Sequence, residues 1–173
     1  MSMDVDEAIR TAIEFETRVR DQYVRAAAAA TDPAAKSVLA TLAKEEQGHL
    51  QYLEHRLEEW RASGKLTAKR LATALPSPER IRDGLARLEA RMKPAATPPA
   101  GEEQTLRTAL GAEQDVGAFY KRMVAELPGE ARTMFRRFVE IEEGHLAIVQ
   151  AELDAVTRLG FWFDTAEFRL EEE

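Results

Sequence analysis

The sequence predicts an all-α protein, a four-helix bundle in which two antiparallel hairpins are joined by a long crossover containing a short helix. Apolar residues recur at steps of three, four and seven through four long stretches, as they do on one face of an α-helix. A Glu-x6-Tyr segment, followed about thirty residues later by Glu-x-x-His, occurs twice, with offsets of 97 positions (16 to 113) and 96 positions (49 to 145). The 173 residues therefore predict one domain built from a duplicated helical hairpin.

The first predicted helix covers about residues 4–30. Ile9 and Ile13 mark its apolar face, and Glu16 and Tyr23 fall in the same register. A glutamate therefore lies on the face that the fold should bury, where an ionisable side chain is rare unless it is paired.

The second predicted helix covers about residues 33–63 and follows almost at once. Asp32 is suited to the N-cap, Pro33 to the first helical position, and Gly64 to the stop. A connection this short makes the two helices antiparallel neighbours. The core-facing register of the second helix holds apolar residues together with one glutamate and one histidine: Leu39, Leu42, Glu46, His49, Leu53 and Leu57.

Residues 64–101 break the helical pattern, hold five of the seven prolines, and predict the crossover. A short helix from about 78 to 92, capped by Ser77, is expected inside it because Ile81 and Leu85 fall on one side. An unstructured connection of this length would be unusual.

The second hairpin repeats the first, with helices predicted at about 102–127 and 130–159. Pro128 and Gly129 form the turn between them, and Gly160 ends the last helix. The buried registers again mix apolar residues with glutamate, and the last helix adds a histidine: Leu106, Leu110, Glu113, Tyr120 and Val124, then Phe135, Phe138, Glu142, His145, Val149 and Leu153.

The C-terminal segment, residues 160–173, is rich in aromatic residues. It contains Phe161, Trp162, Phe163 and Phe168. We expect it to pack over the bundle or a partner subunit, because a free end would expose these rings to water.

Composition excludes several classes of function. The absence of cysteine rules out disulfides, thiolate metal sites and thiol catalysis. A formal charge of -7 disfavours a nucleic-acid or anionic-membrane surface. No apolar stretch has the length of a signal peptide or a membrane helix. A cytoplasmic protein with no nucleic-acid or membrane partner is therefore expected.

Four glutamates on apolar helix faces require a compensating charge: Glu16, Glu46, Glu113 and Glu142. Like charges about 4 Å apart repel by roughly 4 kcal/mol even at an effective dielectric near 20. In both Glu-x-x-His pairs, completed by His49 and His145, the spacing lets carboxylate and imidazole reach one cation. This pattern is typical of di-metal carboxylate bundles, in which two divalent ions balance four carboxylates.

The ligand types favour particular metals. Oxygen-rich ligation with one histidine per metal suits iron or manganese better than structural zinc or copper. Two iron ions are the favoured cofactor, because iron can change its charge against fixed carboxylates, and manganese remains an alternative.

Two further pairs of residues repeat beside the ligands. Tyr23 and Tyr120 follow their glutamates by two turns, where each hydroxyl either orients a carboxylate on a facing helix or belongs to an ordinary core tyrosine. Gly48 and Gly144 each cost about 1 kcal/mol of helix propensity relative to alanine. Their repetition suggests either close helix approach or room for an exogenous ligand.

At these residues the chain resembles the rubrerythrin-type branch of the ferritin-like di-iron proteins. The resemblance covers both Glu-x6-Tyr segments, both Glu-x-x-His segments, the crossover and the Gly-Phe-Trp-Phe-Asp run at 160–164. It implies a ferritin-like bundle, often a homodimer, that reduces hydrogen peroxide or dioxygen at a di-iron centre. It also implies these iron ligands: Glu16, Glu46, His49, Glu113, Glu142 and His145.

Two features depart from that family. The rubredoxin-like cysteine domain is absent, so a separate electron donor is expected. Rubrerythrins also carry an extra glutamate one turn after the third-helix ligand, where this chain has Val116 and Gly117. The second departure argues against efficient peroxidase turnover and against the metal shift associated with that carboxylate.

The sequence therefore predicts a di-iron redox protein that oxidises Fe(II) or reduces peroxide or dioxygen. Tyr23 and Tyr120 are predicted to assist the metal ligands. Three alternatives stay open: an iron storage or delivery protein without turnover, a manganese catalase, and a purely structural bundle.

Overall fold

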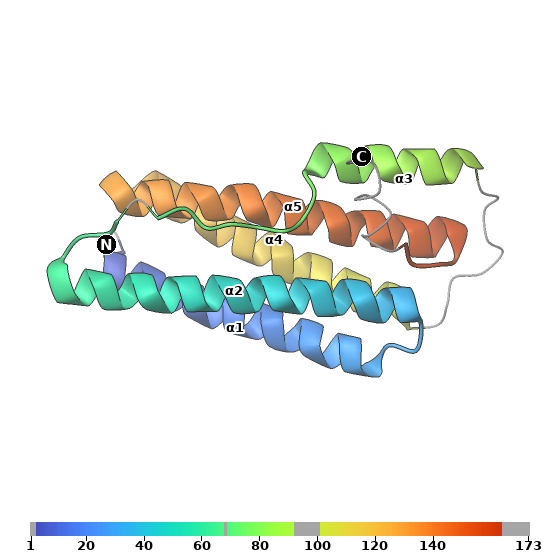
Figure 1. Cartoon of the computed structure of the whole chain (residues 1–173), viewed down its shortest axis with the longest axis horizontal. Helices are drawn as coiled ribbons and strands as arrows, with labels where there is room; N and C mark the ends of the chain where they lie inside the picture. The colour runs from blue at the N-terminus through green and yellow to red at the C-terminus, as the bar shows by residue number, and fades with distance from the viewer. Residues whose placement is uncertain (1–2, 68, 92–100, 164–173) are drawn as a thin grey trace.

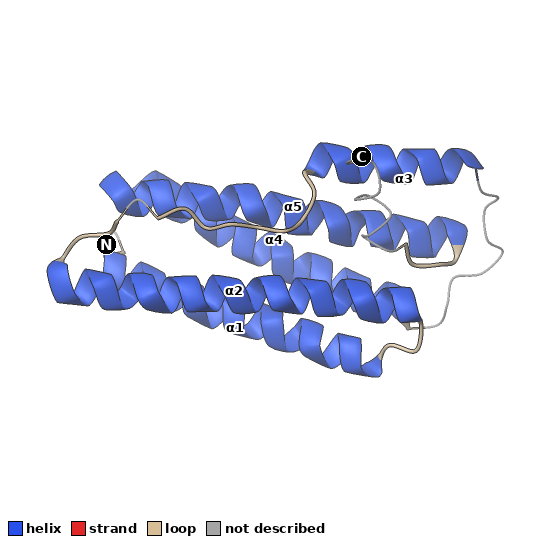
Figure 2. Ribbon diagram, in the orientation of Figure 1, coloured by secondary structure: helices blue, strands red, loops and turns tan. Residues whose placement is uncertain are grey.

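The computed structural model describes residues 3–67, 69–91 and 101–163. Within these ranges the regular structure is entirely helical, with no strand (Figures 1 and 2). The helices agree with the predicted bounds to within one residue at each end: α1 Val5–Ala29, α2 Pro33–Ser63, α3 Pro78–Arg91, α4 Glu102–Glu126 and α5 Gly129–Leu159.

Local sequence signals set the helix ends. The Asp4 side chain accepts a hydrogen bond from the Glu7 backbone N–H at 2.8 Å, and Asp32 accepts from two backbone N–H groups at the start of α2 at 2.8 and 3.0 Å. Gly64 and Gly160 end α2 and α5 with φ of 66° and 76°, a left-handed conformation that glycine adopts without strain. The cap predicted at Asp32 and the stops predicted at Gly64 and Gly160 are confirmed, and the cap at Asp4 is an additional finding.

The four long helices form a bundle of two antiparallel hairpins, α1 with α2 and α4 with α5 (Figure 1). The hairpins meet in part through packing of α1 against α4, and α3 lies on the outside of α5. The core between them is apolar, as the helical periodicity predicted. It also encloses eight polar or charged residues that are at most 2% exposed: Glu16, Glu46, His49, Arg56, Glu113, Glu142, His145 and Glu152.

The first part of the crossover is held against the bundle by side chains that bond to its backbone. The Tyr52 hydroxyl donates to the carbonyl of Lys69 at 2.7 Å, and Arg137 Nε donates to the carbonyl of Leu71 at 3.0 Å. Since these side chains come from α2 and α5, this segment ties the two hairpins together across one face of the bundle.

The predicted short helix in the crossover is confirmed as α3. The Ser77 hydroxyl accepts from the Arg80 N–H at 3.4 Å at its start. Ile81 and Leu85 are buried, as expected from their common face. Arg158 of α5 pairs with Glu89 of α3 at 3.0 Å, which holds the outer helix against the bundle.

The start of the aromatic tail packs on the bundle. Trp162 and Phe163 are 5% and 1% exposed, and Trp162 Nε1 donates to Glu102 Oε2 at 2.6 Å. The Phe163 N–H donates to Glu152 Oε2 at 3.2 Å, which gives that buried carboxylate a partner. Phe168 lies outside the described residues.

Close helix approach does not explain the repeated glycines. A Cβ built on Gly48 or Gly144 would meet no atom within 4 Å, apart from the chain neighbours and the helix's own backbone. That interpretation is wrong at both positions, because the neighbouring helices leave space for a methyl group there.

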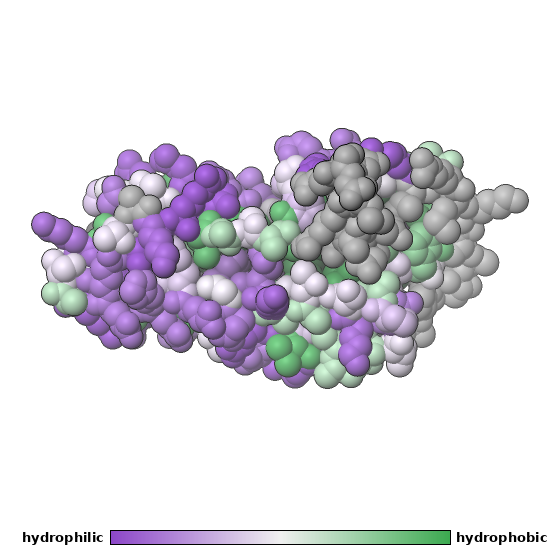
Figure 3. Space-filling view, in the orientation of Figure 1, coloured by the Kyte–Doolittle hydropathy of each residue, from purple (hydrophilic) through white to green (hydrophobic). Residues whose placement is uncertain are grey.

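On the face seen in Figure 3, the surface of the described residues is mainly hydrophilic, with apolar groups in small patches. In the described part of the chain, no helix combines the length and apolar character needed to cross a membrane.

Candidate metal centre

The six predicted ligands come together between the two hairpins. Each is at most 2% exposed, and they come from four helices: Glu16 of α1, Glu46 and His49 of α2, Glu113 of α4, and Glu142 and His145 of α5. The three-residue spacing in α2 and α5 places carboxylate and imidazole on the same face, toward the opposite hairpin.

One group of donor atoms surrounds His49 Nδ1. Carboxylate oxygens lie 3.2 Å away on Glu16, 3.0 Å away on Glu46 and 3.4 Å away on Glu142. These four residues offer ligand atoms that all lie within 4.8 Å of one another, and all four are buried. The group can hold one cation.

A second group surrounds His145 Nδ1. Oxygens of Glu46, Glu142 and Glu113 lie 2.7, 3.4 and 3.9 Å from it. These four residues also offer ligand atoms within 4.8 Å of one another. The second group repeats the first with the roles of the hairpins exchanged.

The two groups share two carboxylates. Glu46 places Oε2 beside His49 and Oε1 beside His145. Glu142 places Oε1 beside His49 and Oε2 beside His145. Glu46 and Glu142 therefore belong to both groups, while Glu16 and Glu113 each belong to one.

The donor atoms form few hydrogen bonds with one another, and a bound cation would give them the missing partner. Both oxygens of Glu46, Oε1 of Glu142, Oε2 of Glu113 and Nδ1 of His145 are buried without a hydrogen bond among the described residues. Their contacts of 2.7 to 3.9 Å are close but poorly aligned for hydrogen bonding. Ligand atoms about 2.1 Å from a shared metal lie about 3.0 to 3.4 Å apart, so the residues present fit metal ions.

A third grouping includes Glu45 with the two histidines. Glu45 is only half-buried, and its two oxygens already accept from Thr73 Oγ1 at 2.5 Å and from the Ala74 N–H at 3.3 Å. Its carboxylate therefore fixes the crossover and is the weaker candidate for a ligand.

Burial governs the protonation of the carboxylates. It raises the pKa of Glu46 and Glu142 well above the usual range, and the neighbouring glutamate charges raise it further. Burial also raises the pKa of Glu113, to about 7, although the hydrogen bond from Tyr23 acts in the opposite direction. Without a cation, burial therefore favours the protonated form of these three carboxylates.

The two histidines differ. Burial would lower the pKa of His49, but the charge of Glu16 outweighs it and raises the pKa to about 9. Burial also opposes ionisation of Glu16, and the His49 charge overcomes it, so that the Glu16 pKa falls to about 2. Burial and the His49 charge lower the pKa of His145 to about 3. His49 and Glu16 thus form an ion pair beside a neutral His145.

Packing orients the imidazoles. The rings of His49 and His145 stack with centroids 5.2 Å apart and planes 10° apart. The Phe138 ring meets His49 edge-on at 5.4 Å and also lies 4.7 Å from the Tyr120 ring. Nε2 of both histidines has no hydrogen-bond partner in the described part of the chain. The ring contacts, together with the hydrogen bond between His49 Nδ1 and Glu16 Oε2 at 3.2 Å, therefore set these orientations.

Each tyrosine reaches across to the opposite hairpin. The Tyr23 hydroxyl of α1 donates to Glu113 Oε1, and the Tyr120 hydroxyl of α4 donates to Glu16 Oε1. Each of the two glutamates that belong to a single group is therefore oriented by a tyrosine, and the arrangement is reciprocal.

Removing either hydroxyl is expected to weaken metal binding. Tyr23→Phe and Tyr120→Phe should each lower metal affinity by about 10- to 100-fold, because an unsupported carboxylate loses its orientation. Competition with a chelator measures the effect. Tyr52→Phe is the matched control, since its hydroxyl bonds the Lys69 carbonyl and no ligand. Equal affinities in all three variants would contradict the orienting role.

Two buried charged residues were not predicted from the sequence. Arg56 and Glu152 each stand seven positions after a histidine of the centre and are 1% and 0% exposed. Arg56 pairs with Glu59 at 3.1 Å and donates to Thr67 Oγ1 at 2.7 Å, which fixes the start of the crossover. The heptad spacing was the available signal that both lie in the buried register.

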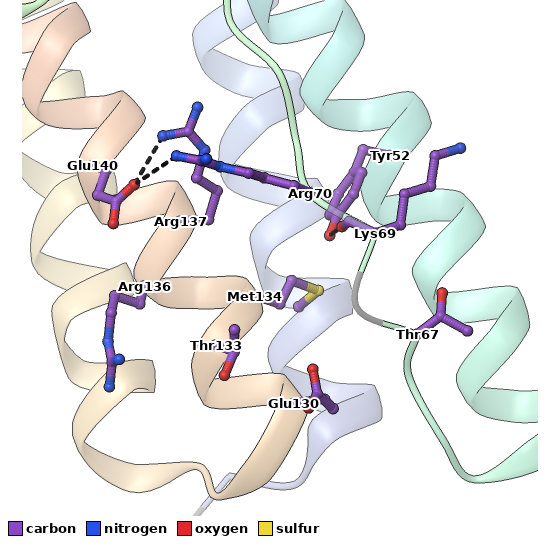
Figure 4. Close-up of a pocket in the computed structure, with 10 residues that line it drawn as sticks. All are labelled: Tyr52, Thr67, Lys69, Arg70, Glu130, Thr133, Met134, Arg136, Arg137 and Glu140. Carbon is purple, nitrogen blue, oxygen red and sulfur yellow. Dashed lines mark hydrogen bonds and ion pairs between the residues drawn. The ribbon is translucent and has the colours of Figure 1, made fainter.

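A separate pocket of about 280 Å³ lies between α2, the crossover and α5 (Figure 4). Its wall includes Arg70 and Arg137, which pair with Glu140 at 3.9 and 2.8 Å. None of the six donors lines it, so the metal chemistry is not located there.

Comparison with known proteins identifies no relative: no family model, no curated protein and no solved structure matches the chain. The buried donor cluster in a helical bundle defines a candidate metal-binding protein, and the geometry of that cluster is the basis for its function.

Proposed function

We propose that the chain is a ferritin-like di-iron redox protein of the rubrerythrin type. The observation that carries the proposal is the sharing of Glu46 and Glu142 between two donor groups, each completed by one histidine and one further glutamate. A single cation would leave one of the two groups unfilled. The arrangement therefore favours a pair of ions.

Charge supports the same count. Four buried carboxylates carry -4 when ionised, and two divalent cations carry +4, so a doubly loaded centre is formally neutral. The donors are six side chains of which four are carboxylates, which favours iron or manganese over a structural zinc. Both metals can change oxidation state, and we propose iron as the occupant.

The four glutamates and two histidines of the cluster would hold and orient the two ions. Bound there, iron would supply the two electrons that, with two protons, convert hydrogen peroxide to two waters. Tyr23 and Tyr120 each donate a hydrogen bond to one of these glutamates, and Phe138 packs against His49 to exclude water. Since the chain has no cysteine, re-reduction requires a separate electron donor. We propose a homodimer as the working form.

Stopped-flow absorbance after addition of peroxide or dioxygen to the Fe(II)-loaded protein tests the proposal. Oxidation should be faster than that of the same Fe(II) in free solution. The matched control is a Glu46→Ala, Glu142→Ala variant, in which the rate should return to that of free Fe(II). Oxidation of the parent no faster than in free solution would rule out the redox function and leave iron handling as the alternative.

A further inference from the structure

The duplicated hairpins are not equivalent beside the metal centre. On the second hairpin, a pocket of about 190 Å³ lies between α4 and α5, and Glu113 and Glu142 form part of its wall. Its volume is several times the roughly 30 Å³ that a water molecule occupies in the liquid. Two carboxylates of the centre therefore border a space that is large enough for a small molecule.

Small and apolar side chains form most of the remaining wall. Gly117 and Ala118 come from α4, and Val139 and Leu146 come from α5. A Cβ built on Gly117 would meet no atom within 4 Å, apart from its chain neighbours and its own helix backbone. The absence of a side chain at Gly117 therefore contributes to the space.

Lys121 and Glu143 mark the outer side of this pocket. They are 62% and 54% exposed and pair at 3.4 Å, so their charges largely cancel there. The apolar wall disfavours any ion, because an ion would lose its hydration there without a compensating partner. These features favour a small uncharged molecule.

The first hairpin carries a different residue at the equivalent position. The offset of 97 that relates Glu16 to Glu113 also relates Arg20 to Gly117, and the offset of 96 relates Gln47 to Glu143. Arg20 donates to Gln47 Oε1 at 3.1 Å, so a guanidinium spans α1 and α2 where the second hairpin has its pocket. At the position where the second hairpin has Gly117, the first hairpin therefore has an arginine whose side chain reaches the neighbouring helix.

We infer that the pocket beside Gly117 is the access route by which a small uncharged molecule, of the size of dioxygen or hydrogen peroxide, reaches the metal centre. This inference rests on the proposed di-metal function. It adds that access is one-sided, through the second hairpin.

Nitric oxide, an uncharged diatomic ligand of ferrous iron, tests the route without requiring turnover. Gly117→Arg places on α4 the residue that α1 already carries, and should slow nitric oxide association with the anaerobic Fe(II)-loaded protein by at least about tenfold with the iron content unchanged. Gly111→Arg, on the same helix and outside this pocket, is the matched control and should bind as the parent does.

Two further variants keep the test decisive if Gly117→Arg folds poorly. Gly117→Leu should also slow association, and Arg20→Ala should speed it by opening the first hairpin. Unchanged nitric oxide association in well-folded Gly117 variants overturns the inference. Slower Fe(II) loading with normal nitric oxide association also overturns it, because the pocket would then be the route of the cation. A parent that binds no iron removes both proposals. Pocket-dependent binding without faster Fe(II) oxidation keeps the access route and removes the redox function.

Discussion

Replacing Glu142 with alanine is expected to empty both metal positions, whereas replacing Glu16 should empty only the one beside His49. Glu142 gives one oxygen to each donor group, so its loss removes a ligand from both. Glu16 belongs to the His49 group alone. The expected metal content is about two ions per chain in the parent, about one in Glu16→Ala and about none in Glu142→Ala.

Elemental analysis of purified protein, loaded with a ferrous or manganous salt and freed of excess metal, measures these contents. Glu46→Ala should behave as Glu142→Ala does, and Glu113→Ala as Glu16→Ala does. Glu45→Ala is the matched control, because its oxygens contact the crossover and it should keep both ions. Equal losses from all four ligand variants would show that the carboxylates are not divided into shared and unshared pairs.

The metal-free protein is expected to lose stability as the pH rises from about 6.5 to 9. Folding raises the pKa of His49 from 6.5 to about 9. A group whose pKa is raised by folding contributes its full stabilisation below the pKa that it has in the unfolded chain. This stabilisation is lost as the pH rises through the pKa that the group has in the folded protein. The shift amounts to about 3 kcal/mol in the free energy of unfolding.

The buried carboxylates act in the same direction. Folding raises the pKa of Glu113 from 4.5 to about 7, and that of Glu46 and Glu142 well above 4.5, so their stabilising contribution is also lost as the pH rises. His145 has a lowered pKa of about 3, and its opposite effect is complete by pH 6.5. Above pH 6.5, His49 and these three carboxylates therefore all lower the stability of the folded protein as the pH rises.

Urea unfolding of the metal-free protein at pH 6.5 and at pH 9 measures the change. The metal-loaded protein is the control, because bound cations replace the protons and should keep stability nearly constant over this interval. A metal-free protein that is equally stable at both pH values would show that the cluster does not hold these protons in the folded state.

The helices and the ligand set could be predicted because their signals are local. Asp32 and Gly64 mark helix ends through their own backbone preferences, and Glu46 with His49 identify a ligand pair by spacing alone. The positions of Tyr23 and Tyr120 also followed from repetition, although sequence could not decide between the orienting role and an ordinary core position.

The rest depends on contacts between distant segments. No periodicity indicates that Arg137 bonds the Leu71 carbonyl or that Glu152 receives the Phe163 N–H, because those partners are set by the path of the connections. The difference between Arg20 and Gly117 is visible in the aligned repeats. Its meaning emerges only when the pocket between α4 and α5 is seen beside the carboxylates.

The reciprocal arrangement of donors means that neither hairpin contains a complete donor group. Each histidine group takes two glutamates from its own hairpin and one from the other, and each tyrosine donates to a carboxylate on the other hairpin. A single hairpin therefore holds only three of the six donors: Glu16, Glu46 and His49 in the first, and Glu113, Glu142 and His145 in the second. Docking of the two halves of the chain is what assembles either group.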